Sequence, residues 1–587
     1  MMRTGVLEDK SRQTYWNQRC SVIYSERACQ IKRKIPAAGM PLNAPLKPLI
    51  SYITARKKTF FLLLTIGAGI YILWPLHNFQ NYLAQGDHGR DLYCFKKAME
   101  GAVPYRDFSW LFGPLMPYYY SIFYSLGGVS IQSVLLGQML LVLLTGVFIY
   151  LTCSVFLSPS VAFACALWYW GFRGMEFFYT YNHIGGLLAM IASLYCLFRY
   201  IRDSKLGHAY AGFVCIFLLA MIRLNMGLAI LAGYVLSLYI TDLVMKDKAA
   251  AKKRLLFAGL SLAVAGMALL VHWLLLSPLP DYAISQSFPY AKSQRVDQSA
   301  TPLSALRYGW DLIYSYFTAT LAQIFFGALL LLSAAQTLFL LCAKKLPEAH
   351  RKNLILAFLS LFLFMVLSSH EFVASGVYYR IVWFFPLIYI AIFFLITTAT
   401  WLIQSRAVQM LILTVLLFPS VLNIDREHFL IRLYKNPAHL LQIGNNRIYT
   451  TQDPWWFQTV YEATAFIKQN IPPSDTILVL PLDPLYLFLG ERDSATRQLV
   501  FFEHFNIPPQ QELDVIADME KNRGNWAIIS NRSVSQEGGM GTFGKDYCPI
   551  LAKYLEDHFA QVAQFGDWTN PPGWAWNHGV KILKRVR

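Results

Sequence analysis

The sequence predicts an all-α polytopic membrane protein with about eleven transmembrane helices, additional interfacial helices and a small C-terminal α/β domain. Three observations predict this fold class. Of the 587 residues, 56% are hydrophobic and only 14% are charged, whereas soluble domains carry nearer a quarter charged residues. Apolar runs that could cross a hydrocarbon core of about 30 Å recur along most of the chain. Beyond the last run, helix and strand patterns alternate instead.

Basic loops set the direction of the predicted spans. The net charge is +17, and much of it lies in the N-terminal segment and in loops near Arg199, Lys246, Lys344 and Arg406. Cytoplasmic loops are enriched in Lys and Arg, so we assign these segments to the cytoplasm and expect no nucleic-acid partner. The predicted spans are Thr59–Leu76, Ile131–Leu151, Val161–Tyr179, Ile184–Leu197, Tyr210–Ile222, Gly227–Met245, Leu255–Leu276, Thr318–Cys342, Leu354–Leu367, Arg380–Thr398 and Val408–Leu422.

The apolar segment Leu111–Leu126 is predicted to lie in the outer membrane interface without spanning the membrane. It is short, contains Pro114 and Pro117, and carries tyrosines that suit the headgroup level. Counting it as a span would reverse every later helix and place all the basic loops outside. The interfacial assignment is therefore preferred.

This topology divides the chain into three parts. Residues 1–58 form a basic cytoplasmic segment with 12 Lys or Arg against 3 Asp or Glu. Residues 59–422 form the transmembrane domain, with outer loops at 78–130 and 277–316. Residues 423–587 form the α/β domain outside the cytoplasm. Within it, the patterns predict helices over Tyr461–Asn470, Glu512–Asn522 and Cys548–Phe559 and strands over Thr476–Pro481, Trp526–Ser530 and Val580–Arg585.

The first outer loop holds the residues best suited to chemistry. Asp87, His88, Arg90 and Asp91 lie close together there. The two aspartates are four residues apart, so they share one face if the segment is helical. The loop follows the first span, which places both carboxylates near the membrane surface. A structural role is the alternative, in which Asp87 caps a helix and Asp91 pairs with Arg90 or Lys96.

From the first span to Gly128, the sequence resembles the GT-C superfamily of polyprenyl-phosphate-sugar glycosyltransferases, especially bacterial relatives of protein O-mannosyltransferases and lipid A aminoarabinose transferases. Those enzymes follow their first span with an Asp-Glu-x-x-Tyr-like motif, an amphipathic helix, a Gly-x-x-Pro-Tyr turn and an interfacial helix. The second acidic position of the motif is His88 here, and Asp91 could substitute for it. The corresponding stretches are Asp87–Tyr93, Leu92–Glu100, Gly101–Tyr105 and Gly113–Tyr118.

The resemblance implies a location in the bacterial inner membrane, in contact with membrane lipid. It also implies transfer of a sugar from a polyprenyl-phosphate donor to a glycan, lipid or protein outside the cytoplasm, with inversion. Attack by an acceptor hydroxyl needs a general base, and Asp87 would serve. Polyprenyl phosphate leaves as a stable anion, so it needs fixed positive charge more than a second acid. Arg223 and Arg380, at outer ends of predicted spans, would bind this phosphate. Snorkelling of each side chain to water is the alternative.

Further polar residues of the outer loops could line the site. We expect no certain cofactor, although Asp87, Asp91 and Asp107 could supply oxygen ligands to Mg²⁺ or Mn²⁺, and the outer loop 277–316 could be a lid or an ordinary loop. The candidate lining residues are His88, Arg90, Tyr105, Asp107, Asn182, His183, Asn225, His370, Glu371 and Tyr379.

Other functions compete with this interpretation. A transporter or flippase would show paired broken helices or an inverted repeat, and we find neither pattern in the sequence. An O-antigen ligase or polymerase also uses lipid-linked sugars, but usually has its large outer loop between late spans, whereas this chain has its acidic loop after the first. A non-catalytic envelope scaffold is a further alternative.

Overall fold

The computed structural model describes most of the chain. The described residues are 56–74, 85–171, 181–245, 250–282, 348–370, 383–402, 440–449, 456–501, 507–531, 541–569 and 579–586, with a few positions between 411 and 422. The chain divides into two compact units, residues 1–57 and residues 58–587. The elements below belong to the second unit, apart from the first residue of helix α3.

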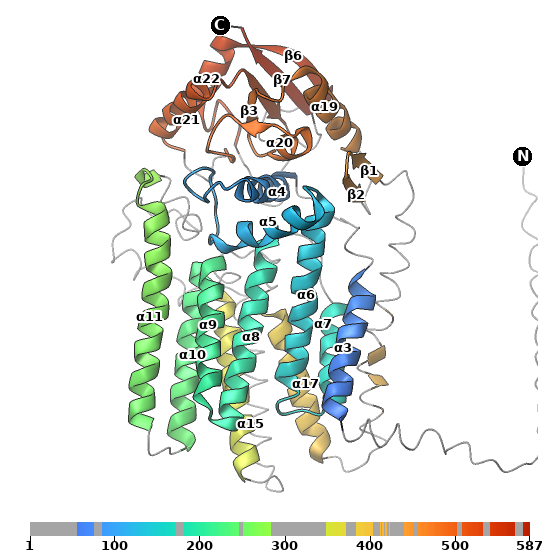
Figure 1. Ribbon diagram of the computed structural model, residues 1–587, viewed down its shortest axis with the longest axis vertical. Helices are drawn as coiled ribbons and strands as arrows, with labels where there is room; N and C mark the ends of the chain where they lie inside the picture. Colours follow the sequence, from blue (N-terminus) through green and yellow to red (C-terminus); the bar gives the residue numbers. More distant parts are fainter. Residues whose placement is uncertain are drawn as a thin grey trace, which may run out of the picture. The chain divides into compact units, whose positions relative to one another are not determined.

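Nine apolar helices of the described chain run side by side as a bundle (Figure 1). By length and composition, α6, α8, α10, α11 and α15 are each able to cross a membrane. The bounds of the nine are α3 (Lys57–Leu73), α6 (Ile131–Cys153), α7 (Pro159–Gly171), α8 (Tyr181–Asp203), α9 (Leu206–Ile222), α10 (Leu224–Met245), α11 (Ala250–Leu276), α15 (Glu348–Ser368) and α17 (Phe385–Leu402).

Each of these nine helices overlaps a predicted span. Of the other two predicted spans, Thr318–Cys342 lies outside the described residues, and Val408–Leu422 is described only at scattered positions. The polytopic helical fold is therefore confirmed, whereas the number of eleven spans stays a prediction.

The helices of the bundle differ in how much of their surface is buried. α8 is buried along most of its length, and its small residues Gly185 and Gly186 let Met116 and Trp383 pack closely against it. α11, in contrast, exposes large apolar side chains such as Leu255 and Leu262. An apolar surface of this kind is typical of a helix that contacts lipid.

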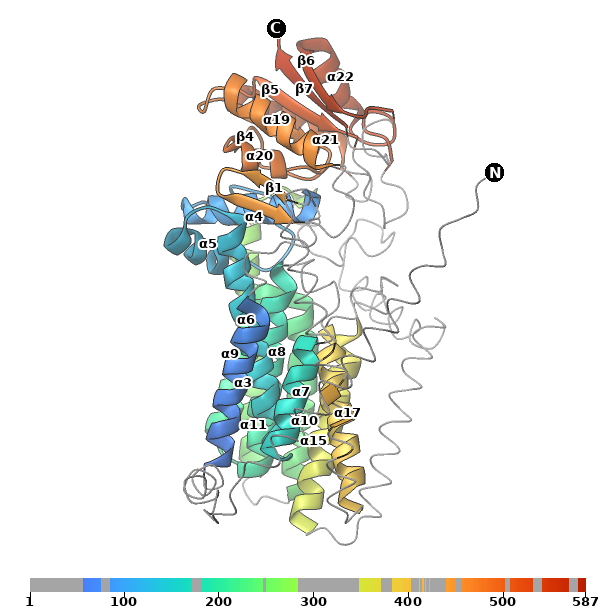
Figure 2. The ribbon, with the colours of Figure 1, turned by 90° about the vertical axis from the view of Figure 1, so that its right-hand side faces the viewer.

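Helices α4 (Gln85–Met99) and α5 (Leu115–Gly127) lie across one end of the bundle (Figures 1 and 2). Just before α5, Gly113 N donates a hydrogen bond to Ile222 O at 2.9 Å, at the end of α9. Just after it, Ile131 N donates to Asn446 Oδ1 of the C-terminal domain at 2.9 Å. With 13 residues, α5 is about 20 Å long, which is shorter than the hydrocarbon core. α5 therefore starts and finishes at the same end of the bundle.

The structure corrects the start of this helix from Leu111 to Leu115. The intervening residues belong to a loop that packs into the corner between α9 and α10. A Cβ on Gly113 would lie 2.1 Å from Met221 O, so the backbone approaches too closely for any side chain. This tertiary contact keeps the loop out of the helix.

The C-terminal domain contains a mixed five-stranded sheet with the order β4-β3-β5-β7-β6. β3 pairs in parallel with β4 and β5, and β7 pairs antiparallel with β5 and β6. A separate hairpin joins β1 (Leu440–Ile443) to β2 (Asn446–Tyr449). The sheet strands are β3 (Thr476–Leu480), β4 (Asp493–Ser494), β5 (Trp526–Ser530), β6 (Phe559–Gly566) and β7 (Gly579–Arg585).

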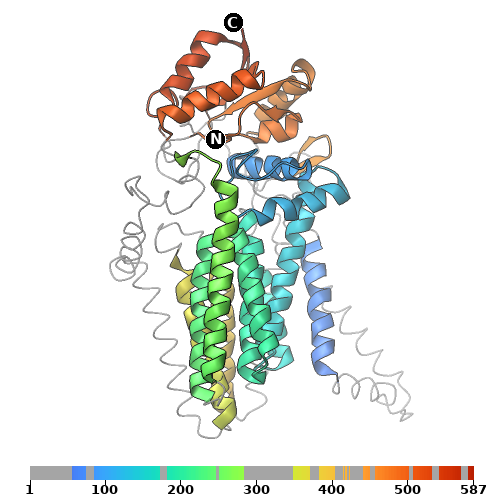
Figure 3. The ribbon, with the colours of Figure 1, turned by 60° about the vertical axis from the view of Figure 1, so that its left-hand side comes forward.

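Helices cover both faces of this sheet, as Figure 3 shows. Alternate residues of a strand point to opposite faces, so Ile477 and Val479 join the core with α19 (Phe457–Asn470) and α20 (Leu485–Gly490). Leu478 and Leu480 pack on the other face with α21 and α22. The bounds of these last two helices are Pro509–Lys521 and Pro549–His558.

The six secondary-structure elements predicted for the C-terminal domain are all observed, with β5 at its predicted bounds. The hairpin and α20 were not predicted, although the dipeptide Gly444-Asn445 between the two strands of the hairpin is typical of a two-residue turn. Cys94 and Cys548 are both buried free thiols. The proposed division of the chain at residues 58 and 422 stays a prediction.

Candidate functional site

Helix α4 brings the predicted acidic pair together around one arginine. Asp87 lies in its first turn. The guanidinium of Arg90 donates from Nη1 to Asp87 Oδ1 at 2.9 Å, and from Nε and Nη2 to Asp91 Oδ1 at 3.0 and 2.8 Å. The pairing of Asp91 with Arg90, which the alternative structural role of the acidic pair includes, is therefore observed. The three side chains form one hydrogen-bonded unit with one carboxylate in excess.

The two carboxylates of this unit differ in exposure. The side chain of Asp87 is 44% exposed, whereas those of Arg90 and Asp91 are each 3% exposed. On its inner side, Asp91 Oδ2 accepts a hydrogen bond of 2.9 Å from Asn182 Nδ2, at the start of α8. Asp91 therefore attaches α4 to the bundle, while Asp87 is accessible from outside.

Burial also sets the charge state of the unit. Burial raises the pKa of Asp91 to about 6, against the opposing effects of Arg90 and Asn182, and neighbouring Asp87 raises it further. Burial alone would lower the pKa of Arg90, but Asp91 and Asp87 together outweigh it, so that pKa is raised. Arg90 stays charged, while Asp91 titrates close to neutral pH.

Arg223 occupies the single-residue break between α9 and α10. Its backbone is extended, with φ −150° and ψ 98°, between two helical neighbours. The break places the Arg223 side chain, 6% exposed, against the aromatic ring of Phe112, whose centroid lies 5.2 Å from Cζ. The same ring lies 5.4 Å from Arg90 Cζ. Phe112 therefore joins Arg223 to the acidic unit.

Three further predicted residues gather beside Arg223. Asn225 Nδ2 lies 3.2 Å from His370 Nε2, which joins α10 to the end of α15. The His183 ring lies 6.1 Å from the Phe112 ring and 5.2 Å from that of Trp383. His183 therefore joins α8 to the first outer loop at Phe112, and Asn225 joins α10 to the residues that follow α15.

The remaining candidate residues have different surroundings. His88 is buried against Tyr181, with ring centroids 4.8 Å apart. Asp107 accepts from Val103 N at 2.7 Å and pairs with Arg106, which is a turn-stabilising role. Three candidates lie outside the described residues, namely Arg380, Glu371 and Tyr379.

Among the described residues, no group of three or more His, Cys, Asp or Glu side chains is placed to hold a metal ion. Asp107 therefore does not combine with Asp87 and Asp91 into the three-ligand set considered from the sequence. The pair on α4 is instead neutralised in part by Arg90.

Sequence reasoning missed the aromatic residues that surround Arg90. Besides Phe112, Trp110 lies near its guanidinium, with 5.8 Å between Cζ and the ring centroid. Tyr105 was expected to line the site; it is buried, and its hydroxyl donates to Phe112 O. The available signal was the aromatic pair that flanks Leu111, just before Gly113-Pro114.

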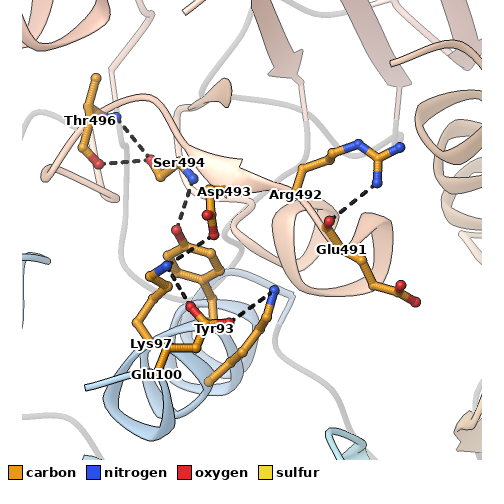
Figure 4. A network of polar contacts seen from close by, with 9 residues as sticks. Tyr93, Lys97, Glu100, Glu491, Arg492, Asp493, Ser494 and Thr496 are labelled. Carbon is orange, nitrogen blue, oxygen red and sulfur yellow. Dashed lines mark hydrogen bonds and ion pairs between the residues drawn. The ribbon is translucent and has the colours of Figure 1, made fainter. Parts of the chain in front are cut away.

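The C-terminal domain contacts α4 directly, as the polar network in Figure 4 shows. Lys97 Nζ pairs with Asp493 Oδ1 at 3.1 Å, and Ser494 N donates to Tyr93 Oη at 2.9 Å. Further along α4, a Cβ on Gly89 would lie 2.5 Å from Leu485 N. The helix that carries the acidic pair is therefore packed between the bundle and the C-terminal domain.

Comparison with solved structures finds the same fold in an archaeal oligosaccharyltransferase. The oligosaccharyltransferase of Archaeoglobus fulgidus in the apo form has a TM-score of 0.51 and 11% identity, covering 89% of this chain and 88% of that one. The same enzyme tethered to an acceptor peptide has a TM-score of 0.51, 12% identity and coverages of 89% and 74%. ArnT from Cupriavidus metallidurans is also found, with 12% identity, a TM-score of 0.42 and coverages of 89% and 98%.

The oligosaccharyltransferase similarity confirms, for the fold, the resemblance to GT-C proteins that the first outer loop indicated. No protein-family model matches the sequence, and a search of curated proteins finds no match.

Proposed function

We propose that this chain is an integral membrane glycosyltransferase. It would transfer a sugar from a polyprenyl-phosphate donor to a glycan, lipid or protein acceptor outside the cytoplasm. The observation that carries the proposal is the Asp87–Arg90–Asp91 unit at the end of the helix bundle, in a fold shared with an oligosaccharyltransferase. The oligosaccharyltransferase has been captured with an acceptor peptide, and ArnT with undecaprenyl phosphate.

Asp87 is the proposed general base. Its exposed carboxylate is held by Arg90 at 2.9 Å, and exposure leaves room for an acceptor hydroxyl. The acceptor oxygen attacks the anomeric carbon, its proton passes to Asp87, and the bond from that carbon to the phosphate oxygen breaks. Attack opposite the leaving phosphate inverts the anomeric carbon. Asp91 is buried, so we assign it the role of holding Arg90 and, through it, Asp87.

Arg223 is the proposed phosphate ligand. The departing phosphate carries its charge without protonation, and a guanidinium can donate two parallel hydrogen bonds to it. A buried site strengthens this attraction because it excludes water. Arg380, outside the described residues, remains the second proposed ligand, and a divalent cation remains a proposal without an assigned set of ligands.

This function also requires a defined orientation. α4, α5 and the C-terminal domain would lie outside the cytoplasm in the inner membrane, with α5 in the interface, and the basic loop after α8 inside. The contacts of α5 at both of its ends support this orientation because they keep the later helices in the predicted direction.

Replacement of Asp87 by Asn tests the proposal. The amide keeps the shape of the side chain and removes its basicity, so transfer should fall by about 10²- to 10⁴-fold. Envelope glycans of a strain without the gene, complemented at matched protein levels, provide the measurement. Asp557→Asn on α22 is the matched control, since this carboxylate is similarly exposed and also pairs with a basic side chain, Lys553, at 2.8 Å. Full transfer by the Asp87 variant would exclude the assigned base.

A further inference from the structure

Phe112 connects the two charged parts of the site. Its ring centroid lies 5.4 Å from Arg90 Cζ and 5.2 Å from Arg223 Cζ. Both arginines are buried, whereas Phe112 is only partly buried. A guanidinium over an aromatic face is attracted by the negative face of the ring, and more strongly away from water. Phe112 therefore contributes to the position of two cations that have lost most of their hydration.

The loop around Phe112 fixes the ring relative to the bundle. On one side, the Tyr105 hydroxyl donates to Phe112 O. On the other side, Gly113 N donates to Ile222 O, the residue before Arg223, at 2.9 Å. Trp110 Nε1 closes the loop with a bond of 3.0 Å to Gly113 O. The backbone of Phe112 is thereby attached directly beside Arg223.

The C-terminal domain holds the other end of this loop. Arg497 Nη1 donates to Tyr105 O at 3.1 Å, and Arg497 O accepts from Ser109 N at 2.8 Å. Tyr105 has a φ of +70°, which is unfavourable for a bulky side chain and persists only where its surroundings hold it. Bonds from the C-terminal domain therefore maintain the turn that presents the Tyr105 hydroxyl to Phe112.

We propose that Phe112 is a positioning residue that directs Arg223 towards the phosphate of the donor, and that Arg497 and Tyr105 hold it in place. The inference rests on the proposed function and deepens it, because it gives the C-terminal domain a part in donor binding. The attraction between the ring and the guanidinium restricts where the Arg223 side chain lies. In a variant without the aromatic ring at position 112, the Arg223 side chain loses this restriction and adopts other orientations.

Two substitutions at Phe112 distinguish the effect of its aromatic face from the effect of side-chain size. Phe112→Leu keeps an apolar side chain but has no aromatic face, while Phe112→Tyr keeps the face. Binding of undecaprenyl phosphate is measured on the purified full-length chain in lipid nanodiscs. We expect the Leu variant to raise Kd by about ten-fold and the Tyr variant to stay within about two-fold of wild type.

Three further variants refine the test. Phe559→Leu is the matched control, because the Phe559 ring lies 5.2 Å from Arg585 Cζ within the C-terminal domain; its Kd should equal that of wild type. Tyr105→Phe and Arg497→Met should raise Kd in the same direction as Phe112→Leu. Combining either with Phe112→Leu should cause little further loss, because all three act through one chain of contacts. Thermal unfolding of each variant separates loss of binding from loss of the fold.

The outcomes distinguish this inference from the proposed function. If wild type does not bind undecaprenyl phosphate, both proposals are overturned. If wild type binds it and Arg223→Met binds it equally well, Arg223 is not the phosphate ligand, and the positioning role of Phe112 fails with it. If wild type binds and Phe112→Leu binds equally well, only the positioning role fails. The same holds if Phe112→Tyr loses as much binding as Phe112→Leu, since packing and not the aromatic face would then explain the result.

Discussion

Asp87 and Asp91 are chemically identical side chains whose surroundings give them different roles. Asp87 is partly exposed and has one bond from Arg90, whereas Asp91 is buried and accepts bonds from Arg90 and Asn182. A base must meet its substrate, and a positioning group must stay in place. The spacing of four residues on one helix provides both a base and a positioning group. Asp87 is accessible from outside, and Asp91, one turn later on the same face, contacts α8.

The charge of Asp91 should control activity near pH 6. Its pKa is raised to about 6, chiefly by burial, so Asp91 takes up a proton as the pH falls through that value and weakens its hold on Arg90. We expect sugar transfer to decline between pH 7 and pH 5, with a midpoint near 6. Because folding raises this pKa, the folded protein favours the protonated form of Asp91. This stabilising contribution to the free energy of unfolding is complete below about pH 4 and is lost as the pH rises through 6.

The pH–rate profile of wild type compared with that of Asp91→Asn measures this effect. The Asn variant cannot titrate at this position, so its profile should lack the step near pH 6. A step that persists unchanged in the variant would assign the titration to another group.

Asn182 should tune this midpoint. Its Nδ2 donates to Asp91 at 2.9 Å and lowers the pKa of the carboxyl group. Asn182→Leu removes the donor, so the midpoint of the pH–rate profile should move upward and the unfolding free energy above that midpoint should fall by about 1–3 kcal/mol. Asn531→Leu, at a buried asparagine of the C-terminal domain, controls for loss of stability alone. A midpoint that stays in place would show that Asn182 does not interact with the charged form.

At the scale of elements, hydrophobic periodicity predicted the helices and strands that depend on interactions between residues close in sequence. The helix over Tyr461–Asn470 and the strand Trp526–Ser530 follow from periodicity, and both are observed. The predicted start of α5 was wrong because the backbone contact between Gly113 and Ile222 keeps the residues before Leu115 out of the helix. No spacing in the sequence reveals a partner so distant along the chain.

The candidate site was predictable to the same extent. Asp87, Arg90 and Asp91 could be found because they share one helix face. Asn182 was placed at the correct end of its span, but its bond to Asp91 joins residues 91 positions apart. The positions of Phe112 and Arg497 depend on the way three separate segments fold together, for which this single sequence carries no pattern.

The close contact of α4 with α20 should make Gly89 sensitive to substitution. A Cβ there would lie 2.5 Å from Leu485 N and 2.8 Å from its Cα, and backbone atoms cannot turn aside. Gly89→Ala should therefore displace α4 between Asp87 and Asp91, and a misplacement of about 1 Å can cost about 10²-fold in rate. Gly67→Ala in α3, where nothing lies within 4 Å, should leave transfer unchanged. Equal rates for both variants would show that the contact tolerates movement.

At the scale of the whole molecule, four contacts fix which ends of the helices meet. Asn182 binds Asp91, Gly113 binds Ile222, Asn225 lies beside His370, and Ile131 binds Asn446. These contacts gather the starts of α6, α8 and α10 and the ends of α9 and α15 at the end that carries α4 and the C-terminal domain. The basic loop after α8 and the basic start of α15 must lie at the opposite end.

This arrangement predicts which side of the membrane each end faces. Positive residues favour the cytoplasm, so the loop between α8 and α9 should be inside and the C-terminal domain outside. Gly207→Cys, with nothing within 4 Å of its Cβ position, and Ser474→Cys, exposed before β3, place single thiols at the two ends. An impermeant maleimide should label Ser474→Cys in spheroplasts, and should label Gly207→Cys only after lysis.

The native thiols set the background of this measurement. The described cysteines are buried, apart from partly buried Cys215, and labelling of the unmodified chain gives their contribution directly. The reverse labelling pattern would place Asp87 and Arg223 in the cytoplasm. The contacts that gather the site hold it at the same end of the bundle as the C-terminal domain. The acceptor would then have to be cytoplasmic, and the proposed transfer outside the cytoplasm would be wrong.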